Sequence, residues 1–270
     1  MKNYIQQKIE NIQNTNQARC IVREYLQART LECLQENHAF VDWAFVGGTA
    51  LRFLYDLPRF SEDLDFSIKA PGVEDHFEDH LVKIKNRFIA EDYDIKIKAK
   101  TNKTVRSAFI KFRGLLYELG LSPLRDEVIS IKVEIDSNPP VGAILETTIV
   151  RRHCLLNLQH YDKGSLLAGK LHALSSRKYT KGRDVYDLMW YLLDRKWPAP
   201  NIELLNNAHR QSQWAGEVFT KDNWRDQLAL FVSKFEWNTV ITDIKPFVEK
   251  QSELDMLTRK NILKLLESSK

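Results

Sequence analysis

Short apolar runs alternate with segments in which apolar residues recur every three or four positions along the first half of the chain. Apolar and polar residues that alternate one by one are typical of a half-buried strand, whereas the longer period is typical of an amphipathic helix. The strands predicted in this way are 43–46, 64–68, 94–99, 105–112 and 128–136. The predicted helices are residues 1–40, 49–56 and 74–90, and residues 146–156 are expected to add a strand or an extended connection. This order predicts a mixed β-sheet flanked by helices.

The pattern becomes helical from Lys163 onward. One helix is expected around Leu167, and another opens at Gly182. Pro198 and Pro200 mark a break after this second helix, because proline cannot continue a helix. The remaining predicted helices are 202–210, 222–234, 238–250 and 254–268, with a kink or a helix start at Pro246. We therefore expect an α+β protein whose sheet region, 1–160, is followed by a helical domain, 161–270.

Composition supports a folded protein of the cytoplasm. The 270 residues are 43% hydrophobic and 28% charged, which is enough apolar material for a packed core. Cys20, Cys33 and Cys154 lack the spacing of metal ligands and are expected to be reduced thiols. No apolar run approaches the roughly 18 residues of a membrane span, and the first residues lack the apolar core of a signal peptide. We expect no membrane partner.

The net charge of +4 is unevenly distributed. Residues 83–113 contain ten lysines or arginines and three acids. Lys96, Lys98 and Lys100 share one face of a predicted strand, and such a face would attract a phosphate backbone. Lysines on an exposed edge strand also prevent aggregation, so this feature leaves RNA binding and edge protection as alternatives.

A glycine pair follows the predicted strand 43–46. Gly47 and Gly48 permit backbone angles that other residues avoid, and they let backbone N–H groups approach a ligand. Thr49 stands where a helix N-cap is expected. A helix N-terminus favours an anion such as a nucleotide phosphate. The alternative is a tight turn without a ligand.

Two carboxylates come next along the chain. Asp63 and Asp65 alternate with apolar residues, so both project from one face of a strand. Mg²⁺ prefers oxygen ligands and usually takes one or two carboxylates plus substrate phosphates. The alternative is a solvated pair at a strand edge. The glycine turn lies before Asp63 in the sequence, with one short predicted helix between them, and this combination favours the metal site.

A third acid is expected on the strand 128–136. Lys132, Glu134 and Asp136 share its polar face. If this strand pairs with the strand of Asp63 and Asp65, then Glu134 or Asp136 would complete the metal site. The alternative is a solvated strand face.

Two further polar positions lie in the helical region. Lys170 is off the apolar stripe of its helix, and Asp184 is in the first turn of the next helix. Taken alone, Lys170 suits a solvated lysine, Asp184 suits a helix cap, and Asp187 suits a surface ion pair with Arg183. The intervening loop is basic and would suit phosphate groups. Its basic residues are Arg177, Lys178, Lys181 and Arg183.

These motifs together resemble the AbiEii/AbiGii-type nucleotidyltransferase toxins, a family of the DNA polymerase β-like nucleotidyltransferase superfamily that includes the MenT toxins of mycobacteria. The first motif is Gly47-Gly48-Thr49-Ala50-Leu51-Arg52, followed by Arg59-Phe60-Ser61-Glu62-Asp63-Leu64-Asp65-Phe66. The strand Lys132-Val133-Glu134-Ile135 resembles the acidic strand of the family. Leu167–Leu174 and Arg183–Leu188 match its lysine helix and its Arg-Asp motif. The motifs keep the family order between residues 45 and 193.

The resemblance implies a role for each matching residue. Asp63 and Asp65 would bind the catalytic Mg²⁺, or Mn²⁺, with Glu134 as a variable third ligand. Lys170 would contact the nucleotide phosphates, and Asp184 would be a further catalytic acid. The residues expected to bind nucleotide are Gly47, Gly48, Thr49, Arg52, Ser61 and Lys170. Many superfamily members have serine where this chain has Thr49, which keeps the hydroxyl.

The expected activity is metal-dependent nucleotidyl transfer from an NTP to an acceptor, in the first place the 3′ end of tRNA. The resemblance implies a toxin with a cognate antitoxin protein. It also implies that residues 1–160 form a nucleotidyltransferase-like domain and that residues 161–270 complete the active site. Two alternatives stay open: a kinase-like phosphotransferase that acts on a protein, and an inactive module that binds a nucleotide or the antitoxin.

Overall fold

The computed structural model describes residues 2–177 and 179–267, and it divides the chain into two compact units. The first unit comprises residues up to 56, together with 60–139 and 147–160. The second comprises 57–59, 140–146 and the residues from 161 onward, so it includes two stretches that a single split at residue 160 does not anticipate. None of the helices in the described residues has the length and apolarity needed to cross a membrane.

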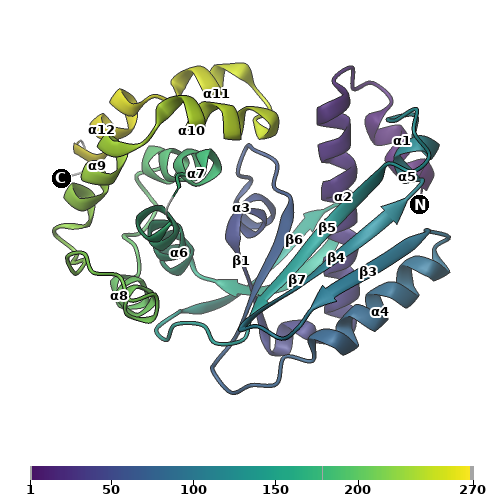
Figure 1. Cartoon of the computed structure of the whole chain (residues 1–270), viewed down its shortest axis with the longest axis horizontal. Coiled ribbons are helices and arrows are strands. Elements are labelled where there is room, and N and C mark those ends of the chain that lie inside the picture. Colours follow the sequence, from purple (N-terminus) through teal and green to yellow (C-terminus); the bar gives the residue numbers. More distant parts are fainter. Residues whose placement is uncertain (1, 178, 268–270) are drawn as a thin grey trace. The chain divides into compact units, whose positions relative to one another are not determined.

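The first unit is built on a seven-stranded mixed sheet, which confirms the predicted architecture (Figure 1). Its strand order is β3-β4-β5-β2-β1-β7-β6. β1 pairs antiparallel with β2, whereas β2–β5 and β1–β7 are parallel. The strands are β1 Trp43–Val46, β2 Asp63–Ile68, β3 Ile95–Lys100, β4 Val105–Arg113, β5 Val128–Asp136, β6 Leu145–Arg152 and β7 Cys154–Tyr161. The single extended segment predicted at 146–156 is two strands, because His153 has φ 61° and interrupts the extended backbone between them.

The prediction of one continuous helix over residues 1–40 is wrong, because the structure has two helices and a 3₁₀ turn within the described part of this segment. The chain breaks after Ile9, and the side chain of Asn14 then caps a new helix by accepting hydrogen bonds from the backbone N–H groups of Asn16 and Gln17. The helices of this unit are α1 Lys2–Ile9, α2 Thr15–Glu36, α3 Gly47–Tyr55, α4 Phe77–Ala90 and α5 Leu115–Glu118, with a 3₁₀ turn at Ala39–Val41. α4 begins three residues later than predicted, where Asp75 accepts a hydrogen bond from the N–H of Phe77 at 3.0 Å.

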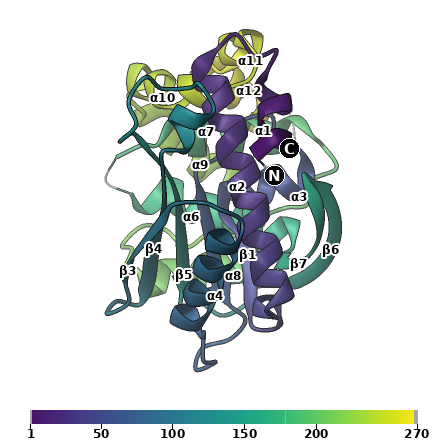
Figure 2. The same cartoon turned by 90° about the vertical axis from the view of Figure 1, so that its right-hand side faces the viewer.

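One face of the sheet is buried and the other is polar. α2 and α4 lie beside each other against the same face, and each contacts a strand, β5 or β3 (Figures 1 and 2). On β5 the odd-numbered residues from Ile129 to Ile135 are buried, whereas the even-numbered residues from Ser130 to Asp136 are half-buried. The period-2 pattern therefore sends the acids and lysines of these strands to the face away from α2 and α4.

The second unit is helical, as predicted. Its helices are α6 Lys163–Ser176, α7 Gly182–Leu193, α8 Ile202–Gln211, α9 Trp224–Lys234, α10 Trp237–Ile244, α11 Gln251–Met256 and α12 Arg259–Glu267, with a 3₁₀ turn at Lys245–Phe247. Pro246 lies in that turn and ends the run of α10. The predicted helix 254–268 is divided between α11 and α12, and residue 268 lies outside the described residues. A Cβ atom at Gly182 would lie 2.0 Å from the carbonyl oxygen of Val240, so glycine permits the close approach of α7 to α10.

The buried carboxylate of Glu24 on α2 holds an ion-pair cluster in the first unit. It contacts Arg52 of α3, Arg152 of β6 at 3.2 Å and His153 at 3.3 Å. Burial would raise the pKa of Glu24, but the hydrogen bond with His153 and the charges of Arg52 and Arg152 outweigh it and lower the pKa to about 2. The charged form of Glu24 therefore stabilises the folded unit.

This cluster predicts a specific sensitivity to acid. The pKa of Glu24 is lower in the folded than in the unfolded chain, so its stabilising contribution is complete above pH 4.5 and is lost as the pH falls towards 2. Between pH 6 and pH 3 the intact chain should lose roughly 2 kcal/mol of unfolding free energy through this group. Urea unfolding followed by circular dichroism measures the loss.

The variant Glu24→Gln should be less stable at pH 6 and should lack this part of the pH dependence. The exposed Glu10 provides the control, since Glu10→Gln should behave like the intact chain. Equal acid sensitivity of Glu24→Gln and the intact chain would contradict the prediction.

Candidate active site

The glycine turn after β1 is shaped by the carboxylate of Asp65. Gly47 has φ +79°, and a Cβ atom placed on it would lie 2.4 Å from Oδ2 of Asp65. The antiparallel register of β1 and β2 places Val46 opposite Asp65, which brings the turn onto this side chain. Two independent constraints therefore require glycine here: a left-handed backbone and the absence of a side chain. The predicted conformational need for Gly47 is confirmed.

Helix α3 begins at the turn itself. Its first residue is Gly47 and its N-cap is Val46, whose side chain cannot cap the helix. The first N–H groups of a helix that lacks a side-chain cap are suited to an anion such as a phosphate. Gly48 lies within this first turn and keeps it free of side-chain bulk.

The prediction that Thr49 is the N-cap is wrong, because the helix starts two residues earlier. Thr49 is fully buried, and its hydroxyl donates a hydrogen bond to the backbone carbonyl of Asp63. This bond joins the first turn of α3 to the start of β2. The side chain of Thr49 thereby holds the glycine turn at Gly47 and Gly48 next to the strand that carries Asp63 and Asp65.

Asp63 and Asp65 lie at the start of β2 on the polar face of the sheet, as predicted. Their partners on β5 are Lys132 and Glu134 in direct register. The ammonium group of Lys132 lies 2.7 Å from the carboxylate of Glu134. Although burial alone would lower the pKa of Lys132, Glu134, Asp63 and Asp65 together raise it. A cationic group is thus already attracted to this group of carboxylates.

The donor set of β2 fits Mg²⁺. This ion takes one or two carboxylates and completes its shell with water and substrate phosphates, and Asp63 and Asp65 offer two carboxylates from one strand face. Within residues 2–177 and 179–267, no group of three or more His, Cys, Asp or Glu side chains is arranged to hold a metal ion. Glu134 as a third ligand therefore stays a prediction. Asp136 instead accepts a hydrogen bond from the N–H of Asn138 at 2.9 Å and stabilises the turn after β5.

Two residues expected to bind nucleotide make contacts within the protein. The guanidinium of Arg52 is buried, pairs with Glu24 and lies 4.2 Å from the ring centroid of Phe60. The backbone carbonyl of Ser61 accepts a hydrogen bond from Gln27 at 3.1 Å. A role in nucleotide binding for Arg52 and Ser61 stays a prediction.

The second unit contains a buried ion-pair network around Lys170 of α6. Its ammonium lies 2.9 Å from Oδ1 of Asp184 and 2.7 Å from Oδ2 of Asp187, both on α7. Asp187 also accepts two hydrogen bonds from Arg59, at 2.6 and 2.7 Å. Arg177 pairs with Asp184. Neither the solvated lysine nor the helix cap considered for Lys170 and Asp184 describes this arrangement.

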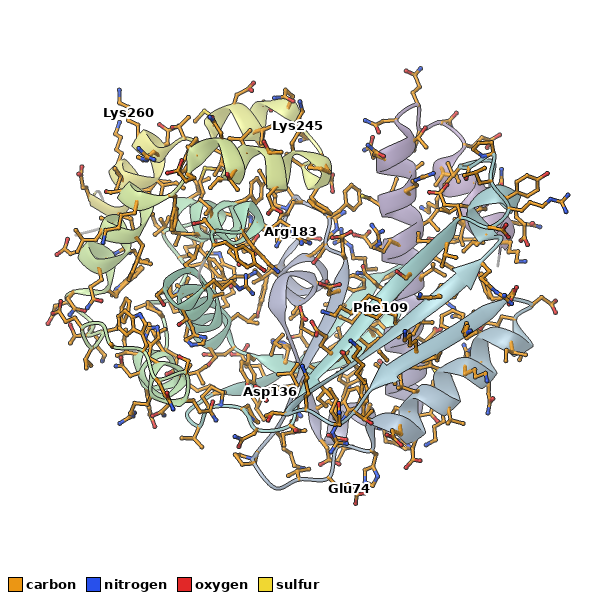
Figure 3. The ribbon with its side chains drawn as sticks, viewed as in Figure 1. Glu74, Phe109, Asp136, Arg183, Lys245 and Lys260 are labelled. Atoms are coloured by element: carbon orange, nitrogen blue, oxygen red, sulfur yellow. The ribbon has the colours of Figure 1, made fainter. Side chains whose placement is uncertain are left out.

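The alternative of a surface ion pair between Arg183 and Asp187 is excluded by the burial of Asp187. Asp187 is fully buried against Arg59 and Lys170, whereas the guanidinium of Arg183 lies 4.6 Å from the ring centroid of Phe247. Figure 3 shows Arg183 on α7. Of the basic loop, Arg177 joins the network, and Lys178 lies outside the described residues.

Arg59 and Asp187 are the two residues that sequence reasoning did not assign to the site. The spacing of Asp184 and Asp187 is a usable signal, because residues three apart lie on one helix face. Arg59 is 2% exposed and has no comparable local signal, since its partner is 128 residues away.

The network favours the charged forms of Lys170 and Asp184. Burial alone would lower the pKa of Lys170, but Asp184 and Asp187 more than offset this and raise it. Burial would raise the pKa of Asp184, yet Lys170 and Arg177 lower it. The lysine is therefore a permanent cation, held by two carboxylates of one helix.

The turn predicts that an added methyl group at Gly47 destabilises the first unit. Gly47→Ala would force a left-handed alanine and push Asp65 away, at a cost of roughly 2 kcal/mol or more in unfolding free energy. The control is Gly169→Ala on α6, where an added Cβ meets nothing within 4 Å and should stabilise the helix by about 0.5–1 kcal/mol. Urea unfolding measures both changes, and equal stability of Gly47→Ala and the intact chain would refute the close approach.

The network predicts a larger loss for Asp187→Asn. Removing this charge leaves Arg59 and Lys170 buried with one carboxylate fewer, and breaking such a pair costs about 3–5 kcal/mol. The matched control is Asp194→Asn, an exposed residue immediately after the last residue of α7, which should change stability by less than about 0.5 kcal/mol. Thermal and urea unfolding test both variants, and similar values for the two would show that the buried pairs contribute little.

Three solved structures share this fold. A candidate nucleotidyltransferase from H. pylori aligns with a TM-score of 0.55 and 18% identity over 93% of this chain and 97% of that chain. JHP933 from Helicobacter pylori aligns with a TM-score of 0.51 and 20% identity over 92% and 94% of the two chains. MenT4, a nucleotidyltransferase toxin from Mycobacterium tuberculosis, aligns with a TM-score of 0.54 and 15% identity over 99% and 89%. No curated protein matches the chain.

A family model supplies the assignment that the fold alone does not. The model of the nucleotidyl transferase AbiEii toxin of type IV toxin–antitoxin systems matches residues 29–259. The match includes the glycine turn, both acids of β2, the strand β5 and the network of α6 and α7. The resemblance stated from the motifs is confirmed, and membership implies an antitoxin partner. The chain belongs to the AbiEii family of nucleotidyl transferase toxins.

Proposed function

We propose that this chain transfers a nucleoside monophosphate from an NTP to an RNA acceptor in a Mg²⁺-dependent reaction. The observation that carries the proposal is the contact of the Gly47 turn with the carboxylate of Asp65. This contact joins a helix N-terminus suited to phosphate with a pair of acids suited to a divalent cation. A triphosphate and its accompanying metal need these two features side by side.

The first turn of α3 would hold the triphosphate through its backbone N–H groups. Thr49 supports this role, because its bond to the carbonyl of Asp63 keeps the turn and β2 at a fixed separation. Asp63 and Asp65 would hold Mg²⁺, which when bound stabilises negative charge on the phosphate oxygens. Lys132 forms an ion pair with Glu134 on β5. Its positive charge limits the repulsion among the acids of this face.

We further propose that Lys170 contacts a phosphate of the nucleotide. An ammonium group has three N–H donors, and contacts with Asp184 and Asp187 account for two of them. The two carboxylates fix the direction of the side chain, and the proposal assigns the third donor to a phosphate oxygen. Asp184 thus acts by positioning Lys170, and Arg177 holds Asp184 in turn.

The proposed acceptor is a hydroxyl at the 3′ end of tRNA. Its oxygen would attack the α-phosphorus of the NTP and form a new P–O bond while the bond from the α-phosphorus to the oxygen that bridges it to the β-phosphate breaks. Pyrophosphate would leave, and a carboxylate such as Glu134 would accept the proton of the hydroxyl. The family membership and the lysine face of β3, formed by Lys96, Lys98 and Lys100, support an RNA acceptor. The antitoxin would be the protein that limits this activity in the cell.

The test is a transfer assay with Mg²⁺, total tRNA and each α-labelled NTP in turn. Asp65→Asn removes one carboxylate charge with little change of shape and should lower labelling of RNA by roughly a hundredfold or more. Mutation of a residue that merely hydrogen-bonds to a metal ligand already lowers activity by up to about a hundredfold, and a ligand itself should matter at least as much. The matched control is Asp126→Asn, which removes an exposed carboxylate from the loop just before β5 begins at Val128. This variant should label RNA like the intact chain.

Labelling of RNA by the intact chain and by Asp126→Asn, but not by Asp65→Asn, would support the proposal and identify the nucleotide. Transfer of label only from a γ-labelled NTP to a protein would contradict it and indicate a kinase-like reaction. Binding of the NTP without transfer to any acceptor would indicate a binding module.

A further inference from the structure

The polar face that carries Asp63 and Asp65 continues across the sheet to its edge strand. The register aligns Asp63 of β2 with Lys132 of β5, Phe109 of β4 and Lys98 of β3. Residues aligned in this way project from the same face of a sheet. A neighbouring row consists of Ser130, Lys111 and Lys96, so basic side chains surround Phe109 on this face.

Phe109 is an apolar side chain on the polar face of β4. It is 38% exposed, whereas its neighbours Ala108 and Ile110 are fully buried on the opposite face. The ammonium of Lys132 lies 5.9 Å from its ring centroid. Figure 3 shows Phe109 on the sheet. This aromatic ring lies among lysines on the face opposite the buried residues of its strand, and its exposed part offers a flat surface on which a nucleobase can stack.

Edge protection explains only part of this surface. β3 is an edge strand, so Lys96, Lys98 and Lys100 would be useful there without any ligand. Lys111 and Phe109 are on β4, which pairs with a strand on each side and needs no such protection. Among the described residues, no carboxylate forms an ion pair with Lys98 or Lys111, so both charges are available for phosphate groups.

We propose that the surface formed by Lys98, Lys111 and Phe109 binds the single-stranded 3′ end of the RNA acceptor, with a base stacked on Phe109 and phosphates on the lysines. The inference rests on the proposed function, since it assigns the acceptor of that reaction to a surface. Strands in a sheet are about 4.8 Å apart, so Phe109 is roughly 10 Å from β2 along the sheet. A base on Phe109 would direct the adjoining sugar towards Asp63 and Asp65.

A single strand fits this surface better than a duplex or a protein. Only an unpaired base exposes its flat face to an aromatic side chain, because the bases of a duplex are stacked on each other. An acidic peptide would pair with the lysines, but it would have no use for the exposed ring of Phe109. The ring therefore favours RNA with an unpaired end.

The experiment measures binding of the full chain to a 5′-labelled single-stranded RNA by fluorescence anisotropy, without NTP. Phe109→Ala should weaken binding roughly 5- to 100-fold, the loss of one stacked base, and Phe109→Trp should retain it. The matched aromatic control is Tyr117→Ala on α5, which is 41% exposed and should have no effect. Binding of a blunt RNA duplex should be weaker and should not respond to Phe109→Ala.

The lysines are tested by a charge-matched pair of double variants. Lys98→Ala/Lys111→Ala should lower the slope of log K against log salt by roughly 1.4, the value for two phosphates of a single strand. Lys83→Ala/Lys85→Ala removes the same charge from α4, which covers the opposite face, and should leave the slope unchanged. Equal effects of the two double variants on the slope would show that RNA binding depends only on the total positive charge of the protein, and would overturn the inference.

Transfer assays separate this inference from the proposed function. If the intact chain labels RNA and Phe109→Ala raises the KM for RNA while the KM for NTP is unchanged, both stand. If the intact chain labels RNA and Phe109→Ala matches it in binding and KM, the inference fails and the function stands. If no RNA is labelled but single-stranded RNA binds through Phe109 and the lysines, the surface stands and the function fails. Binding of a polyglutamate peptide in place of RNA would overturn the inference.

Discussion

The approach of the Gly47 backbone to the carboxylate of Asp65 is the contact on which the candidate site depends. It follows from the antiparallel pairing of β1 with β2, which sets the last residue of β1 opposite the second acid. A chain that leaves β1 at this point must turn immediately, and only glycine can turn there without striking Asp65. The helix that starts at the turn and the strand that carries the acids are therefore fixed by one short contact, which Thr49 reinforces.

Each unit also encloses a set of buried charges, and the two sets differ in what surrounds them. Glu24 in the first unit is a single carboxylate with two arginines and a histidine, so its negative charge is fully compensated. The second unit has two carboxylates, Asp184 and Asp187, on one helix and three cations around them. The first set joins α2, α3 and β6, which suits a structural role. The second sets the direction of a single lysine, which suits a role in binding an anion.

Much of this arrangement follows from local sequence. The alternation in 128–136, the glycine requirement at Gly47 and the shared face of Asp63 and Asp65 depend on neighbouring residues, and each was predicted. The role of Thr49 does not follow from local sequence, because its hydrogen-bond partner lies on β2, 14 residues further along the chain, and no local pattern distinguishes this threonine from an N-cap. Asp187 was misjudged for the same reason: its spacing from Arg183 indicates a surface pair, and only the folded chain brings Arg59 to it. The division of 146–156 depends on the backbone of His153, a residue type that gives little warning of a left-handed conformation.

The membership of residues 57–59 in the second unit has a consequence for how the protein can be divided. Arg59 is two residues before Ser61 in the sequence, yet its counter-ion is Asp187 in the helical part. No single cut of the chain separates the units cleanly. A fragment that ends near residue 160 would keep the guanidinium and lose its carboxylate, whereas the complementary fragment would keep the carboxylate alone. The two units are thus interlaced in the chain, and they are expected to be inherited together and not exchanged as independent modules.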